Sequence, residues 1–224
     1  MAASFAASTN PIISTLAGGR DTQSADQGEY FVAITPTPGT GIVGTASVQA
    51  FTETTPVFVL YNSGTKNIYP MSLRTHLTVV GATASVAEHM TFTLDAGNRF
   101  STISVGVALT VNNLNSGSTT ASGAVIYAGG VVATAATGAR RIVGHIQKKH
   151  TVIEVVHDTT NIVWGGTNAV SYSSVAGNTT TPTYSAHNLP PIVVGPGQSL
   201  VIVEWAAAQT TGSTNEYMFS WIEK

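Results

Sequence analysis

The chain has 224 residues, of which 43% are hydrophobic and only 9% are charged, and its formal net charge is −2 at pH 7. This length fits one all-β domain, or one domain with an arm, and the apolar fraction can supply a sizeable core. A disordered chain would combine low hydrophobicity with high net charge, and a nucleic-acid-binding domain normally presents a basic surface, so neither class is expected. The absence of cysteine excludes a disulfide framework and any Cys-based metal site.

Residues 1–28 differ in pattern from the rest of the chain. They mix Ala, Ser, Gly and Asn with scattered apolar residues and show no sustained period, which is typical of an arm. The first basic residue is Arg20, so a signal peptide is not expected. We predict an extended N-terminal arm at 1–28 and a β-sandwich domain at 29–224. The arm residues expected to contact a partner are Phe5, Ile12, Ile13 and Leu16.

From Glu29 onward, apolar and polar residues alternate with the period of a half-buried β-strand. Two runs, 57–61 and 200–205, are apolar almost throughout and predict strands that are buried on both faces. The predicted strands cover residues 30–34, 57–61, 73–79, 90–94, 103–111, 124–135, 141–147, 151–157, 161–164, 200–205 and 216–221.

The alternation also predicts which side chains share a face, because successive side chains of a strand point to opposite sides. Tyr30, Val32 and Ile34 fall on one face of the first strand. Residues 90–94 alternate apolar side chains with Thr, and five aliphatic residues share one face of the 103–111 strand. Near the C-terminal end an aromatic row occupies one face and needs a second sheet to cover it. This row is Tyr217, Phe219 and Trp221.

Turn-rich segments separate the predicted strands, at 62–64, 112–122 and 165–191. No amphipathic helix longer than two turns is evident. The longest apolar stretch, 123–136, is interrupted by Gly and Thr and is shorter than the ~20 residues of a membrane helix. Many short strands without alternating helices predict an all-β, antiparallel sandwich that is jelly-roll-like.

Several sequence patterns resemble cofactor-binding or catalytic motifs, but each is better explained as a turn or a strand. Residues 39–44 match the bare Gly-x-Gly-x-x-Gly pattern, but the segment that follows predicts a strand where a dinucleotide-binding loop needs a helix. Ser63 and Lys66 have the Ser-x-x-Lys spacing, but they occupy a predicted hairpin turn and not the start of a buried helix. We find no pair of carboxylates suited to acid–base catalysis. We therefore expect no catalytic residue, no cofactor and no enzymatic activity.

The six histidines form no metal-binding motif in the sequence. The densest group is Glu154, His157 and Asp158, but Glu154 and His157 would point to opposite faces of a strand. Exposed or interface polar residues are the preferred interpretation, and no metal site is expected. The histidines are His76, His89, His145, His150, His157 and His187.

Four of the nine basic residues lie within a short span of a chain that is otherwise poor in charge. This cluster is either a patch for an acidic partner or a charged strand edge that resists aggregation. We favour the strand edge and keep the four residues as candidate partner contacts. They are Arg140, Arg141, Lys148 and Lys149.

Five segments, in this order, resemble a type of tailed-phage structural protein: 91–95, 98–100, 124–130, 190–200 and 217–223. The resemblance covers roughly residues 55–224. It implies a β-sandwich, often trimeric, on a capsid shell or in a tail, and it assigns no catalytic residue. In physical terms, Pro196-Gly197 predicts a tight turn before a buried strand, and Arg99 predicts an ion pair with Asp95.

The function expected from these observations is a virion protein that decorates or cements the capsid by binding between major-capsid subunits. It would be made in the host cytoplasm, form a homo-oligomer, with a trimer favoured, and bind neither nucleic acid nor membrane. The alternative is a tail or receptor-binding module that binds a host carbohydrate through the 165–191 segment. That alternative relies on three aromatic residues in or beside the segment, Trp164, Tyr172 and Tyr184.

Overall fold

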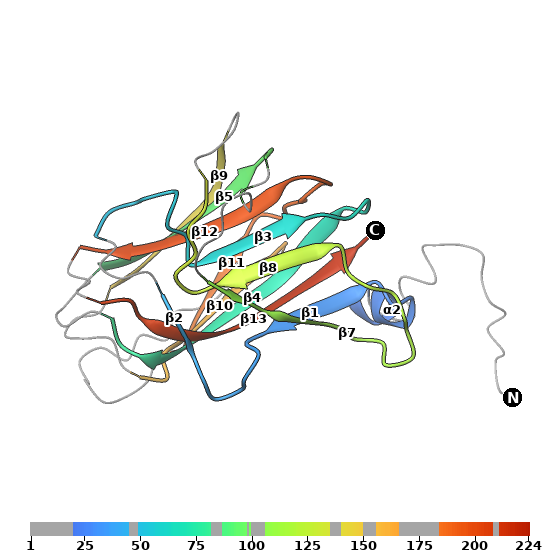
Figure 1. The fold of residues 1–224 in the computed structure, drawn as a ribbon, viewed down its shortest axis with the longest axis horizontal. Helices are drawn as coiled ribbons and strands as arrows, with labels where there is room; N and C mark the ends of the chain where they lie inside the picture. The colour runs from blue at the N-terminus through green and yellow to red at the C-terminus, as the bar shows by residue number, and fades with distance from the viewer. Residues whose placement is uncertain are drawn as a thin grey trace, which may run out of the picture.

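A computed structural model describes residues 20–44, 49–81, 87–97, 99, 106–134, 140–149, 156–165, 184–207 and 211–224. Within this part the chain forms one short helix, α2 (Arg20–Asp26), and two β-sheets (Figure 1). No helix in these residues has the length and apolarity that a membrane span requires. The strands are β1 (Tyr30–Ile34), β2 (Ile42–Val43), β3 (Phe58–Asn62), β4 (Ile68–Val79), β5 (Ala87–Asp95), β6 (Val107–Ala108), β7 (Thr110–Asn113), β8 (Ala124–Ala128), β9 (Arg141–Lys149), β10 (Thr159–Trp164), β11 (Tyr184–Leu189), β12 (Ser199–Ala206) and β13 (Thr214–Glu223).

The two sheets pack face to face as a sandwich. The seven-stranded sheet has the order β11-β10-β4-β13-β1-β7, with β2 also paired to β13. The six-stranded sheet has the order β6-β8-β3-β12-β5-β9. All pairs are antiparallel except β10 with β11, which are parallel. The all-β sandwich predicted from the sequence is therefore confirmed, and its strands are antiparallel as predicted except in this one pair.

The aromatic row of β13 forms the centre of the core between the sheets. Tyr217, Phe219 and Trp221 are at most 3% exposed. The Phe219 ring lies 5.3 Å from Trp221 on its own strand and 5.2 Å from Phe58 on the opposite sheet. The partner sheet that the sequence requires for this row is thus supplied by β3 and its neighbours. The runs at 57–61 and 200–205 are buried on both faces, as predicted, and β3 and β12 are each paired with a strand on both sides.

Two expectations about strand faces need correction. On β1 the buried side chains are Phe31 and Ala33, so the face shared by Tyr30, Val32 and Ile34 is the more exposed one. On β5 the alternate residues Thr91, Thr93 and Asp95 are also buried, because other segments cover the outer face of the six-stranded sheet. These covering segments pack on a second apolar cluster of Val59, Val131, Val201 and Val203.

The predicted 103–111 strand is not one strand in the residues that the structure describes. β6 belongs to the six-stranded sheet, whereas β7 belongs to the seven-stranded sheet, so the chain changes sheets at Leu109. Leu109 is 6% exposed and donates its backbone N–H to the carbonyl of Ile126, whereas Val107 is 41% exposed. Residues Ile103 and Val105 lie outside the described residues, as does most of the predicted 151–157 strand.

The N-terminal part of the predicted arm, 1–19, lies outside the described residues, with its four candidate contacts Phe5, Ile12, Ile13 and Leu16. Residues 20–28 form α2 and the turn that follows it. Gly28 adopts a φ of +67°, which a residue with a side chain rarely adopts. The side chain amides of Asn113 and Asn115 donate to the carbonyls of Gly28 and Asp26 at 2.9 Å each, which fastens this turn to the end of β7.

Truncation of Phe219 to Ala should lower the free energy of unfolding by about 3–5 kcal/mol, because the cavity cannot refill from two rigid sheets. The neighbouring Met218, which is 41% exposed on the opposite face, is the matched control. Met218→Ala should change stability by no more than about 0.5 kcal/mol. Urea denaturation of both variants measures the difference, and equal losses would contradict this core assignment.

Candidate partner-binding surfaces

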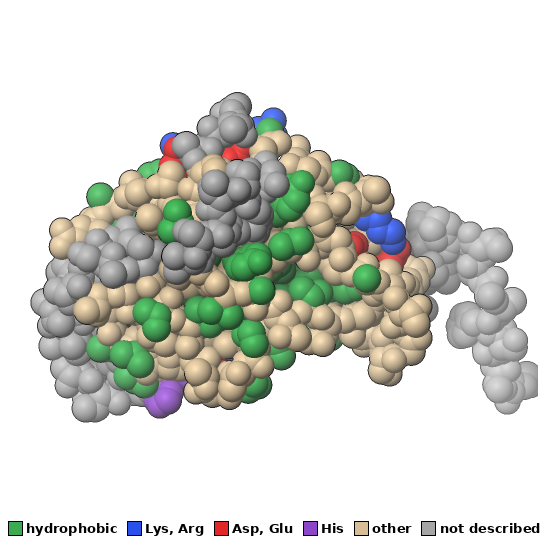
Figure 2. Space-filling model, in the orientation of Figure 1, with side chains coloured by type: hydrophobic (Ala, Val, Ile, Leu, Met, Phe, Trp, Pro, Cys, Tyr) green, Lys and Arg blue, Asp and Glu red, His purple; other side chains and the backbone are tan. Residues whose placement is uncertain are grey.

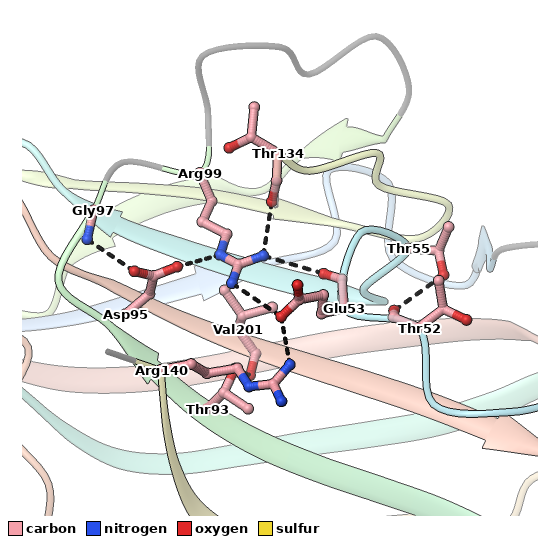
Figure 3. A network of polar contacts seen from close by, with 10 residues as sticks. All are labelled: Thr52, Glu53, Thr55, Thr93, Asp95, Gly97, Arg99, Thr134, Arg140 and Val201. Carbon is pink, nitrogen blue, oxygen red and sulfur yellow. Dashed lines mark hydrogen bonds and ion pairs between the residues drawn. The ribbon is translucent and has the colours of Figure 1, made fainter. Parts of the chain in front are cut away.

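A buried arginine, Arg99, organises the outer face of the six-stranded sheet, and Arg140 of the basic cluster lies close to it (Figure 3). The Arg99 side chain is 2% exposed and that of Asp95, at the end of β5, is 0% exposed. The Nε of Arg99 donates to Oδ2 of Asp95, which confirms the predicted ion pair. Its Nη1 donates to the Thr134 carbonyl at 2.7 Å, and its Nη2 lies 3.5 Å from Oε2 of Glu53. The buried guanidinium of Arg99 has lost its contacts with water, and these carboxylate and carbonyl partners replace them.

Glu53 extends the network to Arg140 at the start of β9. Its Oε2 accepts from Nη1 of Arg140, and the Arg140 guanidinium lies 5.1 Å from the ring centroid of Phe51. Arg99 and Arg140 together therefore hold the segment that contains Phe51 and Glu53 against the sheet. Glu53 was not among the predicted contact residues, and the only signal for it in the sequence is the scarcity of carboxylates in the chain.

The basic cluster does not form one free patch in the described residues. Arg140 is paired with Glu53, and Nζ of Lys148 lies 2.7 Å from Oε2 of Glu88. Arg141 is exposed, and the side chain of Lys149 lies outside the described part. β9 is an edge strand of the six-stranded sheet. This arrangement agrees with the charged strand edge, which was the favoured interpretation of the cluster.

Other charges are also paired within the chain. Lys66 and Lys224 both approach Glu29, at 3.3 and 3.8 Å. The face seen in Figure 2 consequently shows charged side chains mainly near its margins, while hydrophobic side chains are scattered among uncharged polar atoms. Such a surface carries little charge that a partner would have to desolvate or neutralise.

Two adjoining grooves flank the 35–43 segment. The first, of about 390 Å³, is largely apolar and includes Pro36, Ile42, Val43 and Val107 in its lining. Val43 is 63% exposed and Val107 is 41% exposed. The second, of about 330 Å³, lies over the outer face of the seven-stranded sheet and is lined by Ile34, Thr35, Pro38, Arg74, His76, Glu216, Tyr217 and Met218.

The glycines of the 39–44 pattern lie in the loop that separates these grooves. Gly39 has a φ of +83°, and its N–H donates to Oε1 of Glu216 at 2.5 Å. Residues 42–43 form β2, which pairs with β13. β2 thus lies within the glycine pattern, where a dinucleotide-binding loop would have a helix N-terminus. Of the strand predicted after the pattern, residues 46–48 lie outside the described residues and residues 49–51 are not part of a strand.

Four of the histidines form two pairs that the sequence did not predict. Nδ1 of His89 lies 3.3 Å from Nε2 of His145, and Nδ1 of His157 lies 3.2 Å from Nε2 of His76. Each pair also has a threonine hydroxyl on a ring nitrogen: Thr91 at 2.9 Å from Nδ1 of His145, and Thr159 at 3.0 Å from Nδ1 of His76. Within the described residues no group of three or more His, Asp and Glu is placed to hold a metal ion. Glu154 and His150 lie outside those residues.

The space between the sheets also has a polar end. A small enclosed pocket there is lined by Thr75, Leu77, Glu88, Lys148, Asp158, Thr160, Glu204 and Asn215. Burial, with the nearby charge of Glu204, raises the pKa of the Tyr217 hydroxyl far above its ordinary value. Burial, with the charge of Lys148, lowers the pKa of His187. Glu204 was visible in the sequence as the one charge in an apolar run.

No protein-family model, curated protein or solved structure matches this chain.

Replacement of Arg99 by Ala should cost about 3–5 kcal/mol of stability, because the buried Asp95 carboxylate would lose its counter-ion. Arg141→Ala, at an exposed position of β9, is the matched control and should stay within about 0.5 kcal/mol. Adding Asp95→Asn to Arg99→Ala should recover part of the loss, because no unpaired charge remains. Urea denaturation compares the three variants, and an unchanged midpoint for Arg99→Ala would contradict the role of this network.

Stability should fall as the pH drops below about 6.5, the ordinary histidine pKa. Burial, followed by the charge of His89, lowers the pKa of His145, and burial also lowers that of His187. The unfolded chain then binds more protons than the folded chain between the lowered and ordinary pKa values, so acid favours unfolding over that interval. NMR titration should place both histidines below 6.5, and His89→Ala should raise the pKa of His145. Titration of His145 above 6.5 would contradict this account.

Proposed function

We propose that this chain is a non-catalytic structural subunit of a tailed-phage particle, which decorates or cements the capsid by binding between major-capsid subunits. The observation that carries the proposal is the largely apolar first groove beside residues 35–43, whose lining contains no charged residue. Several of the charged side chains in the described part of the sandwich are paired with one another. The resemblance of several sequence segments to phage structural proteins supports the same assignment. We further propose that the chain works as a homo-oligomer, with a trimer favoured.

Binding through such a surface relies on contact area and uncharged polar groups. Removing hydroxyl groups from water costs far less than removing unpaired charges, and the lost water contacts are replaced by hydrogen bonds to the neighbour. The apolar lining of the first groove, with the exposed Val43 and Val107, adds favourable burial. Long-range electrostatic attraction between the protein and the particle would contribute little. We therefore expect particle binding to depend only weakly on salt concentration.

The arm has a defined place in this proposal. α2 lies toward one end of the sandwich and β2 toward the other (Figure 1). Residues 1–19 precede α2, and a chain of that length can span at most about 65 Å. We propose that this segment reaches a neighbouring subunit and binds it through Phe5, Ile12, Ile13 and Leu16.

The carbohydrate-binding alternative receives less support. Trp164 is 4% exposed and packs in the core against Phe92 and Phe219, so it cannot stack on a sugar ring. Tyr184 is 54% exposed on the edge strand β11, and Tyr172 lies outside the described residues.

Val43→Asp should reduce the amount of protein bound to particles by at least about tenfold, because the interface would bury an unpaired charge. Thr120→Asp places the same charge on an exposed loop near β7, away from the grooves, and is the control. Co-sedimentation with phage particles that lack the protein measures occupancy at low and high salt. Equal occupancy of the two variants would reject this groove as the binding surface.

Deletion of residues 2–19, which leaves α2 intact, tests the arm separately in the same assay. Reduced occupancy with an unchanged sandwich, verified by circular dichroism, is the expected result. Full occupancy of the truncated protein would show that the arm has no part in attachment. Failure of the full-length protein to sediment with any particle would reject the proposed function itself.

A further inference from the structure

The His89–His145 pair has the geometry of two ligands of one metal ion. The two residues are diagonal neighbours on the antiparallel strands β5 and β9, since Thr91 lies opposite His145 and His89 lies opposite Gln147. Their facing nitrogens are 3.3 Å apart, and their ring centroids are 5.3 Å apart with an interplanar angle of 27°. This nitrogen separation is long for a hydrogen bond, which is typically about 2.9–3.0 Å.

A tetrahedral zinc ion binds imidazole nitrogens at about 2.0–2.1 Å, so two of its ligand nitrogens lie about 3.3 Å apart. With each ring directed at the ion, the ring centroids would be about 5.2 Å apart. The His89–His145 pair matches both distances without any movement of its strands.

Neighbouring residues hold both rings in this arrangement. Thr91 Oγ1 lies 2.9 Å from Nδ1 of His145, which directs Nε2 toward His89. A contact of this kind, on the nitrogen that does not bind the metal, orients histidine ligands in proteins. On the other side, the Trp205 ring lies nearly parallel to His89, with an interplanar angle of 9° and 4.9 Å between centroids.

We propose that His89 and His145 form a two-imidazole site for a tetrahedral transition-metal ion such as Zn²⁺, with water completing its coordination. Imidazole nitrogen is a suitable ligand for this class of ion. The site lies on the outer face of the six-stranded sheet, where the exposed ring of His145 admits an ion from solvent. A bound ion would link the edge strand β9 to β5.

Trp205 provides a local reporter of this site. The other two tryptophans, Trp164 and Trp221, are 4% and 0% exposed in the core. Co²⁺ occupies tetrahedral zinc sites and quenches the fluorescence of a tryptophan beside it. Titration of the whole protein with Co²⁺ should therefore give saturable quenching, and Zn²⁺ should reverse it by competition.

The variants separate this site from other causes of quenching. His89→Ala and His145→Ala should abolish the saturable phase, and Thr91→Val should weaken Co²⁺ binding by about 10–100-fold. His76→Ala disrupts the other histidine pair and should leave the titration unchanged. Trp205→Phe should remove the signal, while equilibrium dialysis still detects bound Co²⁺ that is lost when His145→Ala is added.

Saturable quenching that survives His145→Ala would overturn the proposal, as would quenching that never saturates in the unmodified protein. Loss of the saturable quenching in the His76→Ala single variant would also overturn the proposal. If an alanine variant has altered circular dichroism, His145→Gln replaces it, since glutamine keeps polarity and approximate size without the imidazole. None of these outcomes depends on particle binding, so the metal site and the proposed function are tested independently.

Discussion

The packing of one aromatic strand between two sheets is the contact on which the rest of this fold depends. Phe31, Phe58 and Trp164 all pack on the row formed by Phe219 and Trp221, so strands from both sheets share one cluster. Around it, β13 is paired to β4 on one side and to β1 and β2 on the other. The grooves at 35–43 and the turn after α2 are both positioned by strands that this cluster anchors.

A second constraint on this fold is the small number of charged residues, several of which are paired with one another. A chain with few ionisable groups can place them where they fasten surface segments, as Arg99 does between Asp95 and Glu53. The same pairing removes those groups from contact with a partner. Recognition by this protein would then rest on shape and uncharged polar groups, which require close fit over a broad area.

The sequence predicted those parts of the fold that depend on the residues of a single strand or on residues a few positions apart. The aromatic row of β13 and the double-sided burial of β3 and β12 were evident because each strand carries its own apolar sequence. The Asp95–Arg99 pair was evident because its members are four residues apart. The change of sheet at Leu109 depends on pairing with β8 and β1, which the segment itself does not specify.

The surface features were less predictable for the same reason. Glu53 lies 46 residues before Arg99 in the sequence, so no spacing rule connects them. The burial of Thr91 and Thr93 results from a covering segment contributed by distant residues. The histidine pairs depend on the register between strands, and a shift of one residue would send His89 and His145 to opposite faces.

The position of β12 and β13 in the chain has a consequence for how the protein folds. They are the last strands in sequence, yet each lies in the interior of its sheet and separates strands formed from earlier residues. Earlier strands such as β1 and β4 cannot complete their sheet until β13 enters between them. Closing such long loops carries an entropic cost before any contact compensates for it, which slows folding. During synthesis the nascent chain would expose the unpaired edges of β1 and β4 until β13 has left the ribosome, and that interval is when it is most prone to aggregate.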